Sequence, residues 1–254
     1  MIGLAALFLG VALLYAMVGF GGGSTYNALL VLVEADYRAI PTISLLCNIV
    51  VVSVGTWRFW KDRHVQWRRI WPLFALSVPM AWFGGRIEVA EEVFVGALAL
   101  TLFVAGLALL WQPEHSGTER EARPSLLEPL VGGVLGFLSG LVGIGGGIFL
   151  APVLHFLRWD RSKVIAGTCA AFILINSIAG LAGQLGKTDG YDRLGAIEAH
   201  WLLFPAVVIG GYIGSRLGSS ILHPKYVRIA TALLILFVSV NLGIRFNDMV
   251  GGPL

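Results

Sequence analysis

Charged residues are scarce in this chain. Only 13% of its 254 residues are Asp, Glu, Lys or Arg, whereas 57% are hydrophobic, and the mean hydropathy is +0.81. This balance lies outside the range of ordinary water-soluble domains and indicates a polytopic membrane protein. Because about 20 apolar residues cross the hydrocarbon core, the sequence predicts eight apolar blocks. They are Ile2–Val33, Ile40–Thr56, Ile70–Ile87, Val93–Trp111, Leu126–Leu157, Val164–Leu185, His200–Ile221 and Tyr226–Ile244.

Residues that carry catalysis or hold cofactors are equally sparse. Cys47 and Cys169 stand alone inside apolar blocks, which favours plain packing. The sequence has no HExxH, no P-loop and no His/Asp/Glu cluster, so we predict no enzyme, no catalytic residue, no metal and no cofactor. No Asp, Glu or Lys lies in the middle of a block, which argues against a carboxylate proton relay. The basic residues lie between blocks and the net charge is only +3, so they indicate membrane topology rather than nucleic-acid binding.

Glycine, in contrast, is abundant and patterned. "AMVGFGGGSTYNA", Ala16–Ala28, and "GLVGIGGGIFLAP", Gly140–Pro152, are near copies about 124 residues apart. Other features align at the same offset, which predicts an internal duplication. The predicted first repeat is 1–111, a polar cytoplasmic linker is 112–125, and the second repeat is 126–254.

The positions of the glycines also determine which loops are predicted to share a side of the membrane. As one straight helix, Ile2–Val33 would span about 48 Å, well beyond a core of about 30 Å. If both long blocks instead turn back at their glycines, the Lys and Arg residues become unevenly divided, as the positive-inside rule requires. One side then holds only Arg38, Arg86, Lys187, Arg193 and Arg245, and the other holds the remaining thirteen of eighteen.

We therefore predict an all-α polytopic membrane protein built from two inverted-topology repeats. Each repeat has a Gly-broken re-entrant helical hairpin plus three transmembrane helices, and both termini lie outside the cell. The start of the chain lacks a basic n-region, so we expect it to stay in the membrane. A tilted, kinked single span is the alternative for each long block.

A helix break inside the membrane must be buried in protein or line a cavity. Half-helices starting after the breaks would present unpaired N–H donors and positive dipole ends, which is an anion site without a buried cation. Ser24 and Thr25 are expected to cap the first of these ends. The candidate substrate-binding residues are Gly21, Gly22, Gly23, Ser24, Thr25, Ser44, Asn48, Gly145, Gly146, Gly147, Thr168 and Asn176. The two asparagines have interhelical hydrogen bonding as their alternative role.

Several other residues have structural interpretations. Arg86 and Arg216 end equivalent blocks and could recruit an anion at the two mouths, or could pair with lipid headgroups. Glycines with four-residue spacing predict close helix packing, namely Gly132, Gly136 and Gly140 and also Gly210, Gly214 and Gly218. Tryptophans near block ends predict an aromatic belt, at positions 57, 60, 67, 71, 111, 159 and 201.

The doubled "GFGGG" and "GIGGG", Pro152, "RSKVIAGT" (Arg161–Thr168) and "GGYIGSRL" (Gly210–Leu217) resemble the TauE/SafE family of sulfite and organosulfonate exporters. The resemblance covers about residues 3–243. It implies a plasma-membrane permease that moves small sulfur-containing anions outward, with Gly21–Gly23 and Gly145–Gly147 as its glycine turns. Alternating access and proton coupling through protonation of the substrate itself would fit such a carrier.

Partners expected from this interpretation are the anion, the lipid bilayer and protons, with homo-oligomerisation left open. The alternative functions are a channel-like or non-transporting assembly subunit, whose glycines serve packing alone, and a permease for another cargo such as a metal cation.

Overall fold

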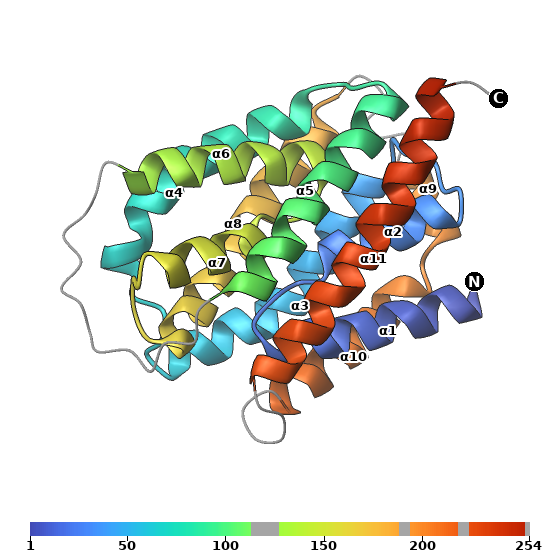
Figure 1. Cartoon of the computed structure of the whole chain (residues 1–254). Coiled ribbons are helices and arrows are strands. Elements are labelled where there is room, and N and C mark those ends of the chain that lie inside the picture. Colours follow the sequence, from blue (N-terminus) through green and yellow to red (C-terminus); the bar gives the residue numbers. More distant parts are fainter. Residues whose placement is uncertain (113–126, 188–193, 218–223, 252–254) are drawn as a thin grey trace.

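The computed structural model describes residues 1–112, 127–187, 194–217 and 224–251, and every regular element in these ranges is an α-helix (Figure 1). The predicted all-α class is confirmed. The first half of the chain forms α1 (Ile2–Met17), α2 (Gly23–Leu32), α3 (Ile40–Lys61), α4 (Trp67–Arg86) and α5 (Glu91–Trp111). The second half forms α6 (Leu127–Val142), α7 (Gly147–Phe156), α8 (Ser162–Leu185), the short α9 (Leu194–Ala199), α10 (Leu203–Leu217) and α11 (Pro224–Gly251).

Both glycine runs interrupt the helices, and α2 and α7 each begin at the third glycine of a triplet and last ten residues. The caps Gly22 and Gly146 have φ values of 89° and 76°, a left-handed conformation that glycine adopts without a steric penalty. The chain reverses at the first break, because the rings of Phe8 and Tyr26 stack with centroids 4.5 Å apart. A continuous helix would separate these two residues by about 27 Å.

The regularly spaced glycines form two close helix seams. Gly132, Gly136 and Gly140 place α6 directly against α4, where an added Cβ would lie 1.8–2.3 Å from a carbonyl oxygen of Leu73, Ser77 or Ala81. Gly210 and Gly214 place α10 against α1 in the same way, 2.2–2.3 Å from the carbonyls of Leu9 and Leu13. Both pairs run parallel, since the contacts advance together along the two helices. The predicted packing role is confirmed for these five glycines, while Gly218 lies outside the described residues.

Helices at equivalent positions of the two halves pair in opposite directions. Gly180 of α8 lies near Leu45 of α3, and Gly167, earlier in α8, lies near Phe59, later in α3. In the same manner α5 runs antiparallel to α11, because Gly96 meets Phe246 and Gly106 meets Leu236. Inverted repeats would require such antiparallel pairing, and the repeats themselves stay a prediction.

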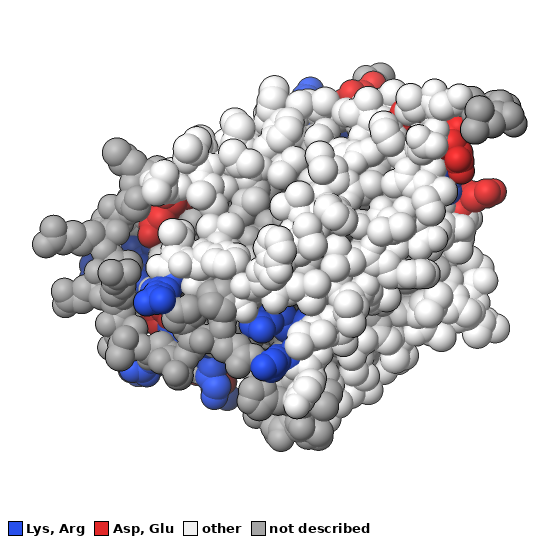
Figure 2. Space-filling view, in the orientation of Figure 1, with Lys and Arg blue, Asp and Glu red and all other residues white. Residues whose placement is uncertain are grey.

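The molecule has the surface of a membrane protein. Four helical segments are long and apolar enough to cross a membrane, namely α3, α5, α8 and residues 228–251 of α11, whereas α1, α6, α7 and α10 are shorter apolar helices. Figure 2 shows a broad belt without charged side chains across one face, with most Lys and Arg gathered at its lower left. Membrane localisation follows from this belt and these spans.

Two ends of the bundle are defined by ion pairs. At the first, which we call the basic end, Arg69 just after the α3–α4 turn pairs with Asp160 in the α7–α8 turn. At the second, the termini end, Arg245 of α11 pairs with Glu91 at the start of α5 over 3.5 Å and donates a hydrogen bond of 2.5 Å to the carbonyl of Val31. The N-terminus and the end of α11 lie on the same side in Figure 1.

One aromatic prediction is wrong. Trp159 is 3% exposed and therefore buried rather than interfacial. The guanidinium of Arg69 lies 4.1 Å from its ring centroid, and its indole N–H donates to Glu128 over 3.0 Å. The buried carboxylate of Asp160 needs a cation beside it, which Arg69 supplies. The Trp159 ring packs against the guanidinium of Arg69 and so helps to hold it there. The other six tryptophans of the predicted belt are exposed, as a belt requires.

Candidate substrate site at the two helix breaks

Asn48 of α3 lies where the two breaks meet. Its side-chain amide donates a 3.0 Å hydrogen bond to the carbonyl of Ile144, in the second break. A Cβ built on Gly21 or Gly23 would lie 2.3 Å from the Asn48 amide, and one on Gly145 would lie 2.9 Å from it. Both glycine turns therefore pack around a single amide, and a side chain at any of these three positions would displace it.

The starts of α2 and α7 bring backbone donors to this place. The N–H groups at the third and fourth positions bond the cap carbonyl, those of Thr25 and Tyr26 to Gly22 and those of Phe149 and Leu150 to Gly146. The N–H groups at the first two positions of each helix precede any intrahelical acceptor and carry the positive end of the helix dipole. Ser44 fixes the approach of α3 to α2 by donating to the carbonyl of Gly23 over 3.2 Å, while the hydroxyl of Ser177 lies 3.1 Å from the position of a Gly145 Cβ. An arrangement of this kind can hold a small anion through hydrogen bonds alone.

Several buried polar atoms around the breaks find no hydrogen-bond partner within the described part of the chain. They are Asn48 Oδ1, Ser139 Oγ and Ser177 Oγ. Buried polar groups are normally paired, so a cluster of this kind calls for water or a ligand.

The structure brings some predicted site residues to the breaks and leaves others aside. Ser44 and Asn48 contact the glycine turns directly. Asn176 and Thr168 are fully buried on α8, but Asn176 donates to the carbonyl of Phe172, one turn earlier in its own helix, over 2.9 Å. Gly22 and Gly146 lie against aromatic rings, those of Tyr26 and Phe172.

The prediction that Ser24 and Thr25 cap α2 is wrong. The capping position is Gly22, and no side chain caps this helix end. Ser24 and Thr25 occupy the second and third helical positions, past the point from which a side chain can reach back to the first N–H groups. Their hydroxyls instead hydrogen-bond the Tyr15 hydroxyl of α1, over 3.3 and 2.7 Å, and so hold the first hairpin closed.

Two buried residues of this region escaped sequence reasoning. Asn27 donates a 2.5 Å hydrogen bond to the carbonyl of Val142, at the end of α6, and is fully buried. It lies four residues after Gly23, and its place at the start of the second turn of a predicted half-helix was a usable signal. Tyr15 gave no comparable signal, because its partners are set by the chain reversal.

Arg86 and Arg216 lie at opposite ends of the protein and not at the breaks. Both are exposed, and each guanidinium lies over an aromatic ring one turn earlier, Trp82 at 5.3 Å and Tyr212 at 4.4 Å. Their role at the mouths of a pathway stays a prediction. Among the residues described, no three His, Cys, Asp or Glu side chains are grouped to hold a metal ion.

All the glycines of the two triplets are buried, as are Ser44 and Asn48. The breaks thus meet in an interior that is closed to both ends of the bundle. Buried non-helical backbone at membrane depth is the condition under which such breaks are tolerated.

Comparison with known proteins agrees with this architecture. Residues 4–242 match the family described as Sulfite exporter TauE/SafE. The chain is 34% identical over 249 residues to the probable membrane transporter protein y4hK of Sinorhizobium fredii, covering 95% of this chain and 97% of that one. It is 28% identical over 237 residues to a probable membrane transporter protein of Methanocaldococcus jannaschii, covering 86% of each. No solved structure matches the chain. Since the family match extends over nearly the whole sequence, including both helix breaks, the chain belongs to the TauE/SafE sulfite exporter family of membrane transporters.

Proposed function

We propose that this protein exports a small sulfur-containing anion, such as sulfite or an organosulfonate, across the plasma membrane by alternating access about its two glycine breaks. The observation that carries the proposal is the convergence of both breaks on the Asn48 amide. Paired broken helices at equivalent positions of two repeats are typical of a transporter's substrate site.

The chemistry of the breaks suits an anion that must bind and leave again. Backbone N–H groups and amide or hydroxyl side chains surround the site, whereas a buried fixed cation would hold an anion strongly. The orphaned atoms Asn48 Oδ1 and Ser177 Oγ are acceptors that a protonated oxyanion or a bound water could satisfy. Because sulfite takes up a proton near neutral pH, proton coupling would run through the substrate.

Contacts between turns support the re-entrant, inverted topology. Arg38, before α3, and Lys187, after α8, line one pocket at the termini end, and Arg69, in the first turn of α4, pairs with Asp160 of the α7–α8 turn at the basic end. Both pairings would be separated by the membrane if every apolar block crossed it once. The positive-inside rule then directs the basic end to the cytoplasm and both termini outward.

Transport requires the closed interior to open to one face at a time. The two close seams, α4 with α6 and α1 with α10, each join one half of the chain to the other. We propose that these seams stay intact and that α3 and α8 separate alternately at either end. The rocking would expose the breaks without breaking the hairpins.

Purified protein tests this proposal directly. Its apparent melting temperature would be titrated with sulfite, thiosulfate, sulfoacetate, sulfate and chloride at matched ionic strength, since a ligand that binds only the folded state raises stability with occupancy. We expect selective stabilisation by one sulfur anion and its loss in Asn48→Ala. Equal responses to all anions, or none, would instead favour a packing role for the glycines and a non-transporting subunit.

Coupling is tested separately in proteoliposomes at fixed substrate ionisation. Faster transport with a pH gradient than without one would support the proton-coupled mechanism, and equal rates would rule it out.

A further inference from the structure

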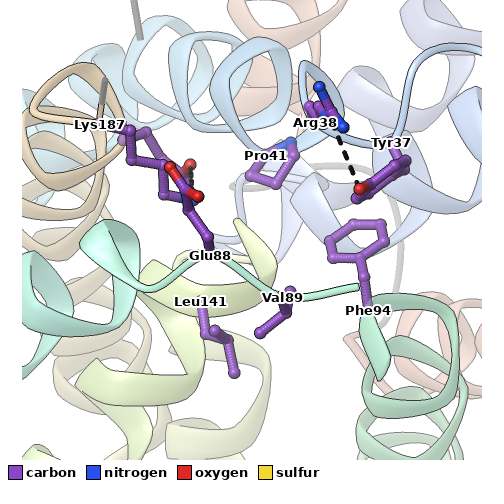
Figure 3. Close-up of a pocket in the computed structure, with 9 residues that line it drawn as sticks. Tyr37, Arg38, Pro41, Glu88, Val89, Phe94, Leu141 and Lys187 are labelled. Carbon is purple, nitrogen blue, oxygen red and sulfur yellow. Dashed lines mark hydrogen bonds between the residues drawn. The ribbon is translucent and has the colours of Figure 1, made fainter. Parts of the chain in front are cut away.

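A polar cavity of about 180 Å³ opens at the termini end. Three connections build it: the turn before α3, the segment between α4 and α5, and the end of α8. Its lining includes Arg38, Pro41, Glu88, Leu141, Gln184 and Lys187. Figure 3 shows Arg38 and Lys187 on opposite sides of the cavity, with Pro41 between them and the segment of Glu88 below.

This cavity lies beside the second helix break. Pro41 lies so close to Gly143 that a Cβ there would be 2.6 Å from the Pro41 Cα. Leu141 comes from the last turn of α6, and Gln184 donates to the carbonyl of Gly140 over 3.0 Å. Ile144, whose carbonyl binds the Asn48 amide, is the next residue after Gly143. Pro41 therefore separates the cavity from the second break and from the proposed substrate site.

Both cationic residues have hydrogen-bond partners beside the cavity. Lys187 donates to the Oε1 atom of Gln184 over 2.8 Å, and Gln184, only 1% exposed, fixes this pair to α6. On the opposite side the backbone N–H of Arg38 donates to Asp36 over 3.0 Å, and its guanidinium donates to the hydroxyl of Tyr37 over 3.4 Å.

We propose that this cavity is an anion-binding vestibule, in which Arg38 and Lys187 together capture a small oxyanion before it enters, or after it leaves, the glycine turns. The inference rests on the proposed function and adds a second, charged site to the uncharged one. Two cations on opposite sides of a concave polar surface concentrate anions locally.

The volume limits what the vestibule can hold. A water molecule occupies about 30 Å³ in the liquid, so the cavity has room for about six. A tetrahedral or pyramidal oxyanion with part of its hydration shell fits this space.

Glu88 allows a test in which substitutions in one cavity have opposite effects on anion binding. Its carboxylate lines the same cavity and opposes the two cations, which weakens the hold on an anion and favours release. Neutralising Glu88 should therefore strengthen anion capture, whereas neutralising Arg38 or Lys187 should weaken it. A purely structural role of these residues would not produce opposite signs.

The experiment measures uptake of radiolabelled sulfite into right-side-out and inverted membrane vesicles. Arg38→Gln and Lys187→Gln should each raise KM about fivefold at low salt, with kcat within twofold, and Glu88→Gln should lower KM about as much. These shifts should appear from the face that the vestibule opens to, and shrink at high salt. The matched control is Lys61→Gln, an exposed cation at the basic end, which should leave KM unchanged from that face.

The outcomes separate the two proposals. If the wild type carries sulfite and all three variants keep its KM, the vestibule is refuted and the transporter function stands. If KM rises in all three, including Glu88→Gln, the residues act structurally and the vestibule is again refuted. If the wild type carries and binds none of the sulfur anions, the proposed function fails and the vestibule with it.

Discussion

Replacing Gly23 with Ala should disrupt the meeting point of the two breaks. The new Cβ would lie 2.3 Å from Nδ2 of Asn48 and 2.9 Å from the carbonyl oxygen of Ile144, whereas contacts are most favourable at about 3.5–4.0 Å. The amide must move and lose its hydrogen bond to Ile144. Overpacking costs about 1–3 kcal/mol, and a buried group left unpaired costs about another 1–3 kcal/mol.

A loss of about 2 kcal/mol at the lower limit corresponds to a fall in melting temperature of about 4–8 °C for a chain of this size. The assay is thermal unfolding of the detergent-purified protein, combined with sulfite transport in proteoliposomes. Gly55→Ala is the matched control, because a Cβ on this glycine of α3 meets nothing within 4 Å, and Ala is the better helix former by about 0.8–1.0 kcal/mol.

A double-mutant cycle identifies the cause. Adding Asn48→Ala removes the group that Gly23→Ala displaces, so the two changes should couple by about 1–3 kcal/mol and the double variant should regain stability. Transport should not return, because the amide itself is lost from the site. Additive effects on stability, or an unchanged melting temperature in Gly23→Ala, would refute the geometry around Asn48.

Other parts of the fold give three further predictions. Gly140→Ala should prevent accumulation of folded protein, measured by size-exclusion chromatography, because its Cβ would lie 1.8 Å from a carbonyl oxygen of α4; a normal yield would contradict the close seam. Cysteines replacing the exposed Glu34 and Arg158 should react with an impermeant maleimide from opposite sides of the membrane, and labelling of both from the same side, which single crossing by every apolar block predicts, would exclude the re-entrant topology. Arg69→Met should lower the unfolding free energy by about 3–5 kcal/mol by leaving the buried Asp160 unpaired, and much of that loss should be recovered when Asp160→Asn is added.

Much of the fold was predictable because it depends on local sequence. Glycine triplets end helices wherever they occur, and both breaks lie where the sequence placed them. Four-residue glycine spacing needs only helical periodicity to form a stripe, so the packing role of Gly136 and its neighbours could be predicted. What the stripe packs against could not: α6 meets α4 of the other half instead of a helix of its own.

The site was predictable in part. Asn48 stood out as an amide inside an apolar block, and it lies at both breaks. Asn176, chosen on the same grounds, bonds within its own helix, since one turn of difference along α8 changes what a side chain can reach. Tyr15 was missed because its role as partner of Ser24 and Thr25 exists only once the chain has reversed.

The sequence by itself determined that the chain is a helical membrane protein, where its helices break, and that the breaks come in a pair. These properties follow from composition, backbone freedom and repetition, which act over a few residues at a time. Tertiary structure alone decided that one amide joins the two breaks, that Ser24 and Thr25 bind Tyr15 instead of capping α2, and that Arg38 and Lys187 share a cavity. Those contacts join residues that are far apart in sequence or on opposite sides of a chain reversal, and only the packing of the helices fixes their distance.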